Sequence, residues 1–453
     1  MSTVIIGGGI IGLSIAYYLS LSRPPSSEEE IHIIDSSAEL FASASGYAGG
    51  FLARDWFNPA VESLGALSFR LHRELAERHG GARKWGYAGS HVYSLSMNEH
   101  GVDAAGKKAK SGDWILEGTS RANEVRSNSE VGAEGPGVKR RDTVNADGSP
   151  AVFTPQKGGT LETIAGPGEC AQVEPRELCQ FLLEEVQKRG VQLHLATRVR
   201  DLVTDVDDLH CLQGLRLVSS LDDEDKYIAC QKIVLAAGAW TPRIFETLFG
   251  TKARIPIEPL AGHSIVVKSP RYKAPFIDPY ERNIGGGRDN WLCYSIYAGP
   301  TRHWDFATEA FARLARNGEA EIWLGGLNDS KLPLPEVATD VKGLMDPKST
   351  AIVRNTIVQL TGLAKAGDEL HQDDLETVRE GLCFRPISES GNPIIAQLEE
   401  EDLGGLMTRG GGVWVASGHG PWGISLSLGT GLVVSELLQG KQTSADMGHL
   451  GLR

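Results

Sequence analysis

The sequence predicts an α/β fold whose strands belong to two sheets. Three observations lead to this prediction. The run TVII at residues 3–6 has strand character and is followed by a glycine-rich turn and a helical pattern. The runs VQLHLATRV and KIVLAAGA read as further buried strands, with a helix over residues 176–189 before the first. The runs IPIEPLAGHSIVVKS and EAEIWLGG read as strands of another sheet.

Length and charge narrow the possible functions. The 453 residues suffice for two or three domains, each with its own core. Hydrophobic residues make up 41% of the chain and charged residues 23%, as is usual for globular proteins. The formal net charge of −13 argues against nucleic acid or an anionic membrane as the main partner.

The cysteines and the apolar runs indicate in which cellular compartment the protein is expected. No C-x-x-C pair occurs among the six cysteines, which are Cys170, Cys179, Cys211, Cys230, Cys293 and Cys383. This pattern predicts neither a metal site nor a disulfide framework, and it favours a reducing compartment. No apolar run reaches the ~18 residues of a membrane helix, and no basic segment precedes the first strand. We therefore expect no membrane span, no signal peptide and an intracellular location.

The first sixty residues indicate a dinucleotide site. Gly7, Gly9 and Gly12 form a G-x-G-x-x-G motif between the first strand and its helix. The glycines permit a tight turn, close approach of a pyrophosphate to the backbone, and close packing of the helix on the strand. A second strand, IHIID, ends at Asp35, whose carboxylate can accept hydrogen bonds from ribose hydroxyls.

The segment after Asp35 favours FAD over NAD. The stretch SSAELFASASGYAGGFLARDW offers small hydroxyl residues and glycines before the apolar pair Phe51 and Leu52. Such residues suit a second loop around the same pyrophosphate and close passage of the backbone by a flat ring. An NAD-binding half usually continues into another βα unit at this point. A plain serine- and glycine-rich loop is the alternative interpretation.

Four separated stretches resemble the D-amino-acid oxidase superfamily of FAD-dependent oxidoreductases, which includes the glycine and sarcosine oxidases. They are VIIGGGIIGLSIAYYL with SASGYAGGFL, then ECAQVEPRELCQFLLEEVQKRGVQLHLATRVRDL, then KIVLAAGAWTPRI, and finally GLCFRPISESGNPII with VWVASGHGPWGISLSLGTG. They occur in the order of the family. The stretches GYAGGFLARDW and KWGY are most similar to a fungal branch linked to endosomal recycling, so endosome association joins the cytoplasm as an expected location.

The resemblance implies an interleaved architecture. A Rossmann-like FAD-binding domain of the glutathione-reductase type would comprise residues 1–85, 166–254 and 380–453. A substrate domain built on an antiparallel sheet would comprise residues 86–165 and 255–379. Residues 98–150 are rich in glycine, serine and charge, and we expect them to form a mobile surface excursion.

The C-terminal run VASGHGPWGISLSLGTG is expected to return to the flavin. It leads into LVVSELLQG, which reads as a helix. Gly418, Gly420 and Gly423 let the backbone lie against the ring edge, and Pro421 suits a first helical turn. The amide groups of that helix would stabilise negative charge on the reduced flavin and so raise its potential. His419 is either a catalytic residue or a buried structural histidine.

Carried over residue by residue, the resemblance assigns cofactor contacts along the chain. They are Gly7, Gly9, Ile10, Ile11, Gly12, Asp35, Ser36, Ser43, Ala44, Ser45, Gly49, Gly50, Phe51, Leu52, Val199, Ala237, Gly238, Trp240, Cys383, Gly418, His419, Gly420, Pro421, Trp422, Gly423 and Ile424.

Three residues near this site carry the expected chemistry. Arg385 matches the arginine that holds the substrate carboxylate in the glycine-oxidase relatives; an ion pair is its alternative role. Cys383, counted back from Ser388, matches the cysteine that binds FAD covalently in the sarcosine-oxidase relatives; a buried packing role is its alternative. Arg54 follows the flavin loop and could face the substrate.

These residues predict a flavoenzyme that oxidises the C–N bond of a small amine or amino acid. Hydride would pass from the α-carbon to flavin N5, and the reduced flavin would be reoxidised by O₂ or another acceptor. A dehydrogenase or demethylase with a different acceptor is one alternative. A flavin-loaded protein of the same fold with a trafficking or binding role is the other.

Overall fold

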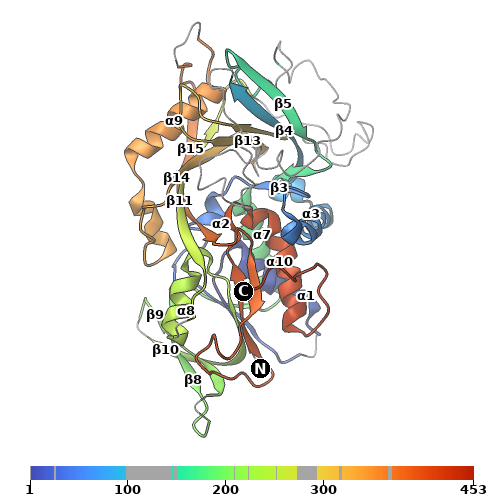
Figure 1. The fold of residues 1–453 in the computed structure, drawn as a ribbon, viewed down its shortest axis with the longest axis vertical. Helices are drawn as coiled ribbons and strands as arrows, with labels where there is room; N and C mark the ends of the chain where they lie inside the picture. The colour runs from blue at the N-terminus through green and yellow to red at the C-terminus, as the bar shows by residue number, and fades with distance from the viewer. Residues whose placement is uncertain are drawn as a thin grey trace.

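The computed structural model describes residues 2–24, 27–97, 145, 150–208, 210–222, 224–250, 253–272, 293–315, 319–365 and 370–452. Apart from residues 145 and 150, the excursion predicted over 98–150 lies outside the described residues. Two sheets form the molecule, one in its lower part and one in its upper part in Figure 1. The mixed α/β architecture predicted from the sequence is confirmed.

The lower sheet has the Rossmann-like topology. Its strand order is β16-β17-β10-β1-β2-β7, and every neighbouring pair is parallel except β16 with β17. The bounds are β1 Ser2–Ile6, β2 Ile31–Ile34, β7 Gln192–His194, β10 Asp225–Leu235, β16 Ile394–Gln397 and β17 Gly412–Ser417. Two antiparallel strands, β8 Thr197–Thr204 and β9 Leu212–Ser219, extend β10 as a ribbon.

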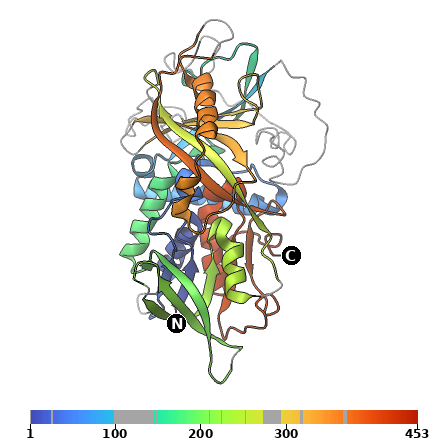
Figure 2. The same cartoon turned by 90° about the vertical axis from the view of Figure 1, so that its left-hand side faces the viewer.

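The upper sheet is mostly antiparallel. Its strand order is β15-β11-β14-β13-β12-β4-β6-β3, with β5 paired to β4 and only β12 and β4 running parallel among these pairs. The bounds are β3 Phe51–Ala53, β4 Ala88–Met97, β5 Gly159–Ala165, β6 Cys170–Gln172, β11 Ile257–Lys268, β12 Cys293–Ala298, β13 Thr308–Leu314, β14 Ala320–Asp329 and β15 Glu376–Ser388. The two long strands β11 and β15 run side by side from the lower part into the upper part (Figure 2).

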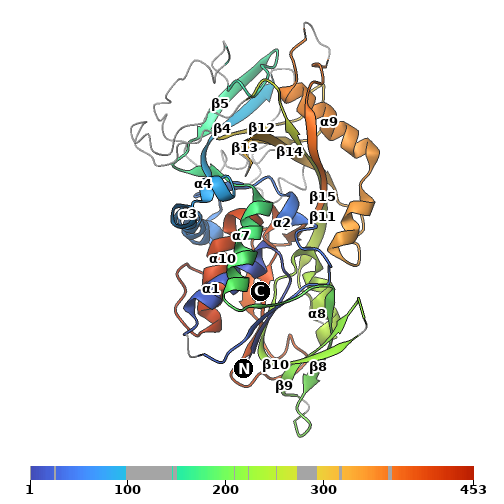
Figure 3. The same cartoon turned by 180° about the vertical axis from the view of Figure 1, so that it is seen from behind.

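Some of the helices begin at a side-chain cap. Their bounds are α1 Ile10–Ser22, α2 Ala44–Tyr47, α3 Pro59–His79, α4 Gly81–Lys84, α7 Pro175–Lys188, α8 Thr241–Phe249, α9 Pro347–Thr361 and α10 Gly423–Leu438. Asn58 and Glu174 cap α3 and α7 by accepting backbone N–H groups, and a proline follows each at the first helical position. Helices α1, α7 and α10 lie together on the lower sheet (Figure 3).

One predicted strand is broken in two. The run VQLHLATRV was expected to form a single strand, but β7 ends at His194 and β8 begins at Thr197. Ala196, between them, has a φ of 48°, and its N–H donates to the carbonyl of Ser37. The chain therefore leaves the parallel sheet here and pairs with β9 instead.

Helix α10 begins nine residues before LVVSELLQG, so part of the glycine-rich run is helical. A Cβ at Gly429 would lie 2.9 Å from Ser68 Cβ of α3, and one at Gly431 would lie 2.5 Å from the Ser14 carbonyl carbon of α1. These two glycines therefore permit close helix packing rather than contact with a cofactor.

The segment Gly420–Leu438 corrects one expectation from the sequence. Among the described residues it is long and apolar enough to pass as a membrane span, although the sequence was expected to hold no such run. Its apolar window is 72% buried inside the structure. Packing against α1 and α3 accounts for its apolar composition.

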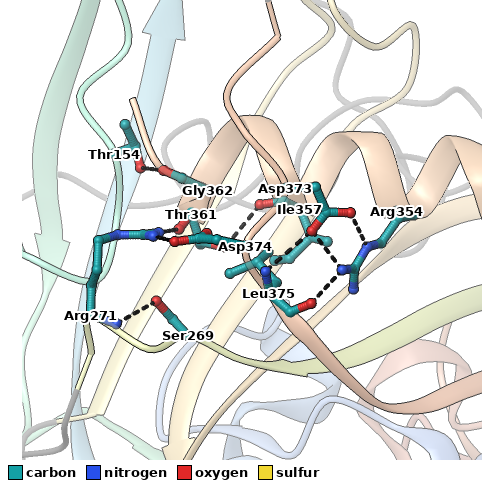
Figure 4. Close-up of polar contacts among 10 residues, drawn as sticks. All are labelled: Thr154, Ser269, Arg271, Arg354, Ile357, Thr361, Gly362, Asp373, Asp374 and Leu375. Carbon is teal, nitrogen blue, oxygen red and sulfur yellow. Dashed lines mark hydrogen bonds and ion pairs between the residues drawn. The ribbon is translucent and has the colours of Figure 1, made fainter. Parts of the chain in front are cut away.

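A polar network fixes α9 to the start of β15 (Figure 4). The Arg354 guanidinium donates to both oxygens of Asp373, at 2.8 and 2.6 Å, and to the Leu375 carbonyl. The adjacent Asp374 points the other way and pairs with Arg271. The two neighbouring carboxylates thus join α9 on one side and the end of β11 on the other.

We expect Gly431→Ala to lower the free energy of unfolding by about 1–3 kcal/mol, because its Cβ would collide with the backbone of α1. Urea unfolding measures this change. Gly343→Ala is the control, since nothing lies within 4 Å of a Cβ there. Equal effects of the two substitutions would contradict the packing role of Gly431.

Candidate active site

A cavity of about 750 Å³ lies where the carboxyl ends of the parallel strands meet the upper sheet. Gly7, Asp35, Ala236 and His419 follow the ends of β1, β2, β10 and β17, and all four line it. Ligands bind at this edge in open parallel α/β sheets. The cavity continues to Gly262 of β11 and Arg385 of β15. It therefore joins a nucleotide-binding edge to a second compartment under the upper sheet.

The glycine motif builds the first wall of the cavity. Gly7 has a φ of 116°, and a Cβ there would lie 2.5 Å from the Ala236 carbonyl oxygen. Only glycine fits this approach of β10 to the turn. Gly12 does not line the cavity; a Cβ there would lie 2.0 Å from the Gly7 carbonyl oxygen, so it serves helix packing. The N-terminus of α1 is thereby held at the cavity, where it favours an anionic phosphate.

Asp35 lies half-buried beside this turn. Its two carboxylate oxygens accept the N–H groups of Gly8 and Ser37, each at 2.9 Å. Burial raises the pKa of Asp35, and these hydrogen bonds oppose the shift. The carboxylate therefore holds the glycine turn in place while it lines the cavity.

The second loop, residues 43–50, meets the first wall and the upper sheet. Ser45 Oγ accepts the Ile10 N–H at 3.0 Å, so it caps α1 from another segment. Ser43 Oγ accepts the Phe384 N–H of β15 at 3.1 Å. The serines predicted as cofactor contacts thus also connect three parts of the site.

Planar side chains cover glycines on the face of the upper sheet that is directed toward the second loop. A Cβ at Gly262 would lie 1.9 Å from Arg385 Nη2, and one at Gly325 would lie 2.3 Å from the Trp323 indole. A Cβ at Gly381 would lie 2.5 Å from the Tyr47 ring. The missing side chains leave room for a guanidinium and two rings to lie flat.

Arg385 and Cys383 lie next to each other on β15 and both line the cavity. Burial raises the pKa of the Cys383 thiol, and the hydrogen-bonded Arg385 guanidinium opposes this shift. Cys383 pairs with Gly262 in the β11 register, so the guanidinium that lies over Gly262 is beside the thiol. None of the described carboxylates forms an ion pair with Arg385.

His419 lies at the other end of the cavity, before α10. Its Nε2 lies 3.0 Å from Thr430 Oγ1. Complete burial lowers the pKa of His419 to about 3, so the ring is neutral near pH 7. This environment favours the structural role over proton transfer.

Most of the predicted cofactor contacts are brought together by the structure. Those that line the cavity are Gly7, Gly9, Ile10, Ile11, Asp35, Ser36, Ser43, Ala44, Ser45, Gly49, Gly50, Phe51, Val199, Ala237, Gly238, Trp240, Cys383, His419, Gly420, Pro421, Gly423 and Ile424.

Five predicted residues lie outside it. Gly12 and Leu52 pack in the core, Trp422 contacts the Phe57 ring, and Gly418 lies against Ser388. Arg54 is 47% exposed and pairs with Asp55 at 3.0 Å, so the structure does not place it at a substrate.

Sequence reasoning missed several cavity residues, among them Tyr47, Phe311, Trp323 and Gly262. Their signal in the sequence is weak, because an aromatic residue on a strand reads equally well as core. The pairing register of the strands distinguishes cavity residues from core residues, because it places the glycines and the large side chains on the same face of the sheet.

The residues present fit FAD. The Gly7 turn and the α1 N-terminus suit a pyrophosphate, and Asp35 suits a ribose. Gly49, Gly50 and Gly420 bring bare backbone to the cavity, which is what a flat ring system requires. The N-terminus of α10 then adds its dipole at the far end.

Two buried neutral histidines make stability depend on pH. His72 Nε2 donates to the Ile424 carbonyl, and burial lowers the pKa of His72 to about 4. Below pH 6.5 the unfolded state protonates both His72 and His419 while the folded state does not.

We therefore expect the free energy of unfolding to fall by up to about 1.4 kcal/mol per pH unit for each histidine as the pH drops from 6.5 toward 4. Urea unfolding at several pH values should show a shallower decline in His419→Gln than in the wild type. The exposed His449 provides the control variant His449→Gln. An unchanged decline in His419→Gln would contradict this assignment.

Comparisons with known proteins agree with the site. The family model "FAD dependent oxidoreductase" matches residues 2–437. The Schizosaccharomyces pombe protein C1F5.03c is 27% identical over 99% of this chain and 96% of its own length. Glycine oxidase from Geobacillus kaustophilus is 20% identical, with a TM-score of 0.63 over 100% of this chain and 98% of its own. L-proline dehydrogenase from P. horikoshii is 15% identical, with a TM-score of 0.63 over 100% and 96%.

At these identities the two solved structures show a common fold, as expected from the resemblance. The family match covers nearly the whole chain. The chain belongs to the D-amino-acid oxidase family of FAD-dependent oxidoreductases.

Proposed function

We propose that this FAD-dependent oxidoreductase oxidises the C–N bond of a small amine that carries a carboxylate, such as an amino acid. The observation that carries the proposal is Arg385, whose side chain lies over Gly262 in the cavity and is not paired with any carboxylate of the described residues. A planar guanidinium is the preferred group for binding a carboxylate through two hydrogen bonds. A half-buried cation without an anion is costly, and a substrate carboxylate would remove that cost.

Aromatic side chains form the rest of this compartment. The Phe311 ring stacks on Trp323 at 5.2 Å between centroids and on Phe51 at 5.7 Å. The Trp323 indole donates to the Tyr47 carbonyl at 3.0 Å, which fixes its orientation. Such walls exclude water and pack against the carbon skeleton of a substrate while Arg385 binds its charged end.

The chain itself supplies orientation and electrostatics rather than proton transfer. When bound, FAD supplies the hydride-accepting chemistry. The α10 N-terminus faces the cavity, where its dipole would stabilise negative charge on a reduced flavin ring. An amine that enters unprotonated needs no catalytic base, which agrees with the neutral, buried His419.

The names of similar proteins are consistent with this substrate class, since they include a glycine oxidase and an L-proline dehydrogenase. These names include both oxidases and dehydrogenases, so the electron acceptor that reoxidises the flavin is left open between O₂ and another molecule. Acid precipitation distinguishes FAD that is bound covalently through Cys383 from FAD that is bound without a covalent bond.

We expect the purified protein to show the absorbance bands of oxidised flavin. Acid precipitation then separates two outcomes: yellow in the supernatant means dissociable FAD, and yellow in the pellet means a bond to Cys383. Cys383→Ser should release the colour only in the second case. A colourless wild-type protein would contradict the proposal and favour a binding role for the fold.

We expect Arg385→Ala to raise KM for a carboxylate-bearing amine by roughly 10- to 150-fold, since charge-assisted hydrogen bonds contribute about 1.5–3 kcal/mol. Steady-state kinetics with a panel of amino acids and their decarboxylated amines measures this change. Arg54→Ala is the matched control, because Arg54 lies outside the cavity. An unchanged KM in Arg385→Ala would remove Arg385 from this role.

A further inference from the structure

A buried arginine lies directly behind the loop that faces the flavin site. Arg313, on β13, has a side chain that is 0% exposed. Its Nη1 donates to the Gly49 carbonyl at 2.7 Å, and its Nη2 donates to Glu174 Oε1 at 3.1 Å. The guanidinium therefore connects the upper sheet to the second loop and to the cap of α7.

Several charged groups surround Arg313. Glu174 also pairs with Arg379 at 3.4 Å, so two guanidinium groups share one carboxylate. Glu321 and the Cys293 thiol face Arg313 as well. Burial raises the pKa of Glu321, and the neighbouring Arg313 opposes this shift. The Arg313 guanidinium is thus held behind the loop among charged partners, screened from water.

The Gly49–Gly50 peptide transmits this contact to the cavity. A trans peptide places its carbonyl and its N–H on opposite edges of one plane. The Gly49 carbonyl is bound to Arg313, so the Gly50 N–H is directed away from the guanidinium. Both glycines line the cavity, and the Gly50 N–H has no acceptor among the described residues.

The backbone around Gly50 is also fixed from the other side. Gly50 has a φ of 87°, and a Cβ there would lie 1.9 Å from the Val173 carbonyl oxygen. Its carbonyl accepts the Val173 N–H at 2.9 Å. Because both carbonyls of this pair of glycines have partners, the peptide between them is fixed, and its N–H is a donor that a ligand in the cavity can use.

We propose that Arg313 is a positioning residue for the flavin. Through the Gly49 carbonyl it holds the Gly50 N–H toward the cavity, where this donor would favour the anionic reduced form of the ring. Arg313 thereby raises the reduction potential of the bound cofactor. This inference rests on the flavin-binding part of the proposed function and is independent of the substrate.

The test compares FAD-loaded wild type with Arg313→Met, Arg313→Lys and Arg379→Met by equilibrating each with a reference redox dye. We expect Arg313→Met to lower the equilibrium constant for two-electron reduction at least tenfold, about 30 mV. Arg313→Lys keeps the charge but loses the fork that bridges Gly49 and Glu174, so we expect at least a threefold decrease. Arg379→Met removes a charge from the same carboxylate but leaves the Gly49 contact, so its effect should be smaller.

A merely structural role for Arg313 would lower the melting temperature and leave the potential unchanged, which would overturn the inference. An equal shift in Arg379→Met would also overturn it, because charge alone would then explain the effect. If Arg313→Met does not fold, combining it with Glu174→Gln removes the buried carboxylate charge that loses its Arg313 partner. If that double variant does not fold either, the reduction potential of Arg313→Lys tests the inference. A wild type without flavin would instead contradict the proposed function.

Discussion

The buried ion pair between Arg313 and Glu174 is the contact on which the rest of the site depends. It joins a strand of the upper sheet to the cap of a helix on the lower sheet, with the second loop bound between them. Burying two charges is expensive, and the geometry must be good for the pair to form at all. The pair therefore favours one arrangement of the two sheets over neighbouring ones in which the charges would be separated. The positions of the aromatic walls and of the Arg385 guanidinium in the cavity depend on that arrangement of the two sheets.

Local sequence patterns predicted the nucleotide-binding edge well. The glycine motif, the strand that ends before Asp35 and the serines of the second loop all lie where their spacing placed them, because each depends on neighbours within a few residues. The helix boundaries near 175 and 188 follow from a proline after a capping acid and from the apolar period. The family resemblance added the order of the distant segments, which no local pattern contains.

Features that depend on tertiary contacts were less predictable. The break at Ala196 arises from a hydrogen bond to Ser37, more than 150 residues away in sequence. Within the C-terminal glycine-rich run, Gly420 and Gly423 line the cavity as predicted, whereas Gly429 and Gly431 face α3 and α1. Arg54 follows the flavin loop in sequence, but its strand turns it toward Asp55 at the surface. Arg313 carries no motif, and only the fold places it behind Gly49.

The position of β17 and α10 has a consequence for how the protein is made. The first strand and helix of the chain complete their core only with β10 and α10, the latter beginning at Gly423. Translation at about 5–20 residues per second separates the synthesis of α1 and α10 by roughly 20–80 s. During that interval the apolar surface of α1 has no partner from the C-terminal segment. The apolar surface of the nascent N-terminal half must therefore be protected from aggregation until the last forty residues leave the ribosome. A chain shortened at the C-terminus would keep this surface exposed.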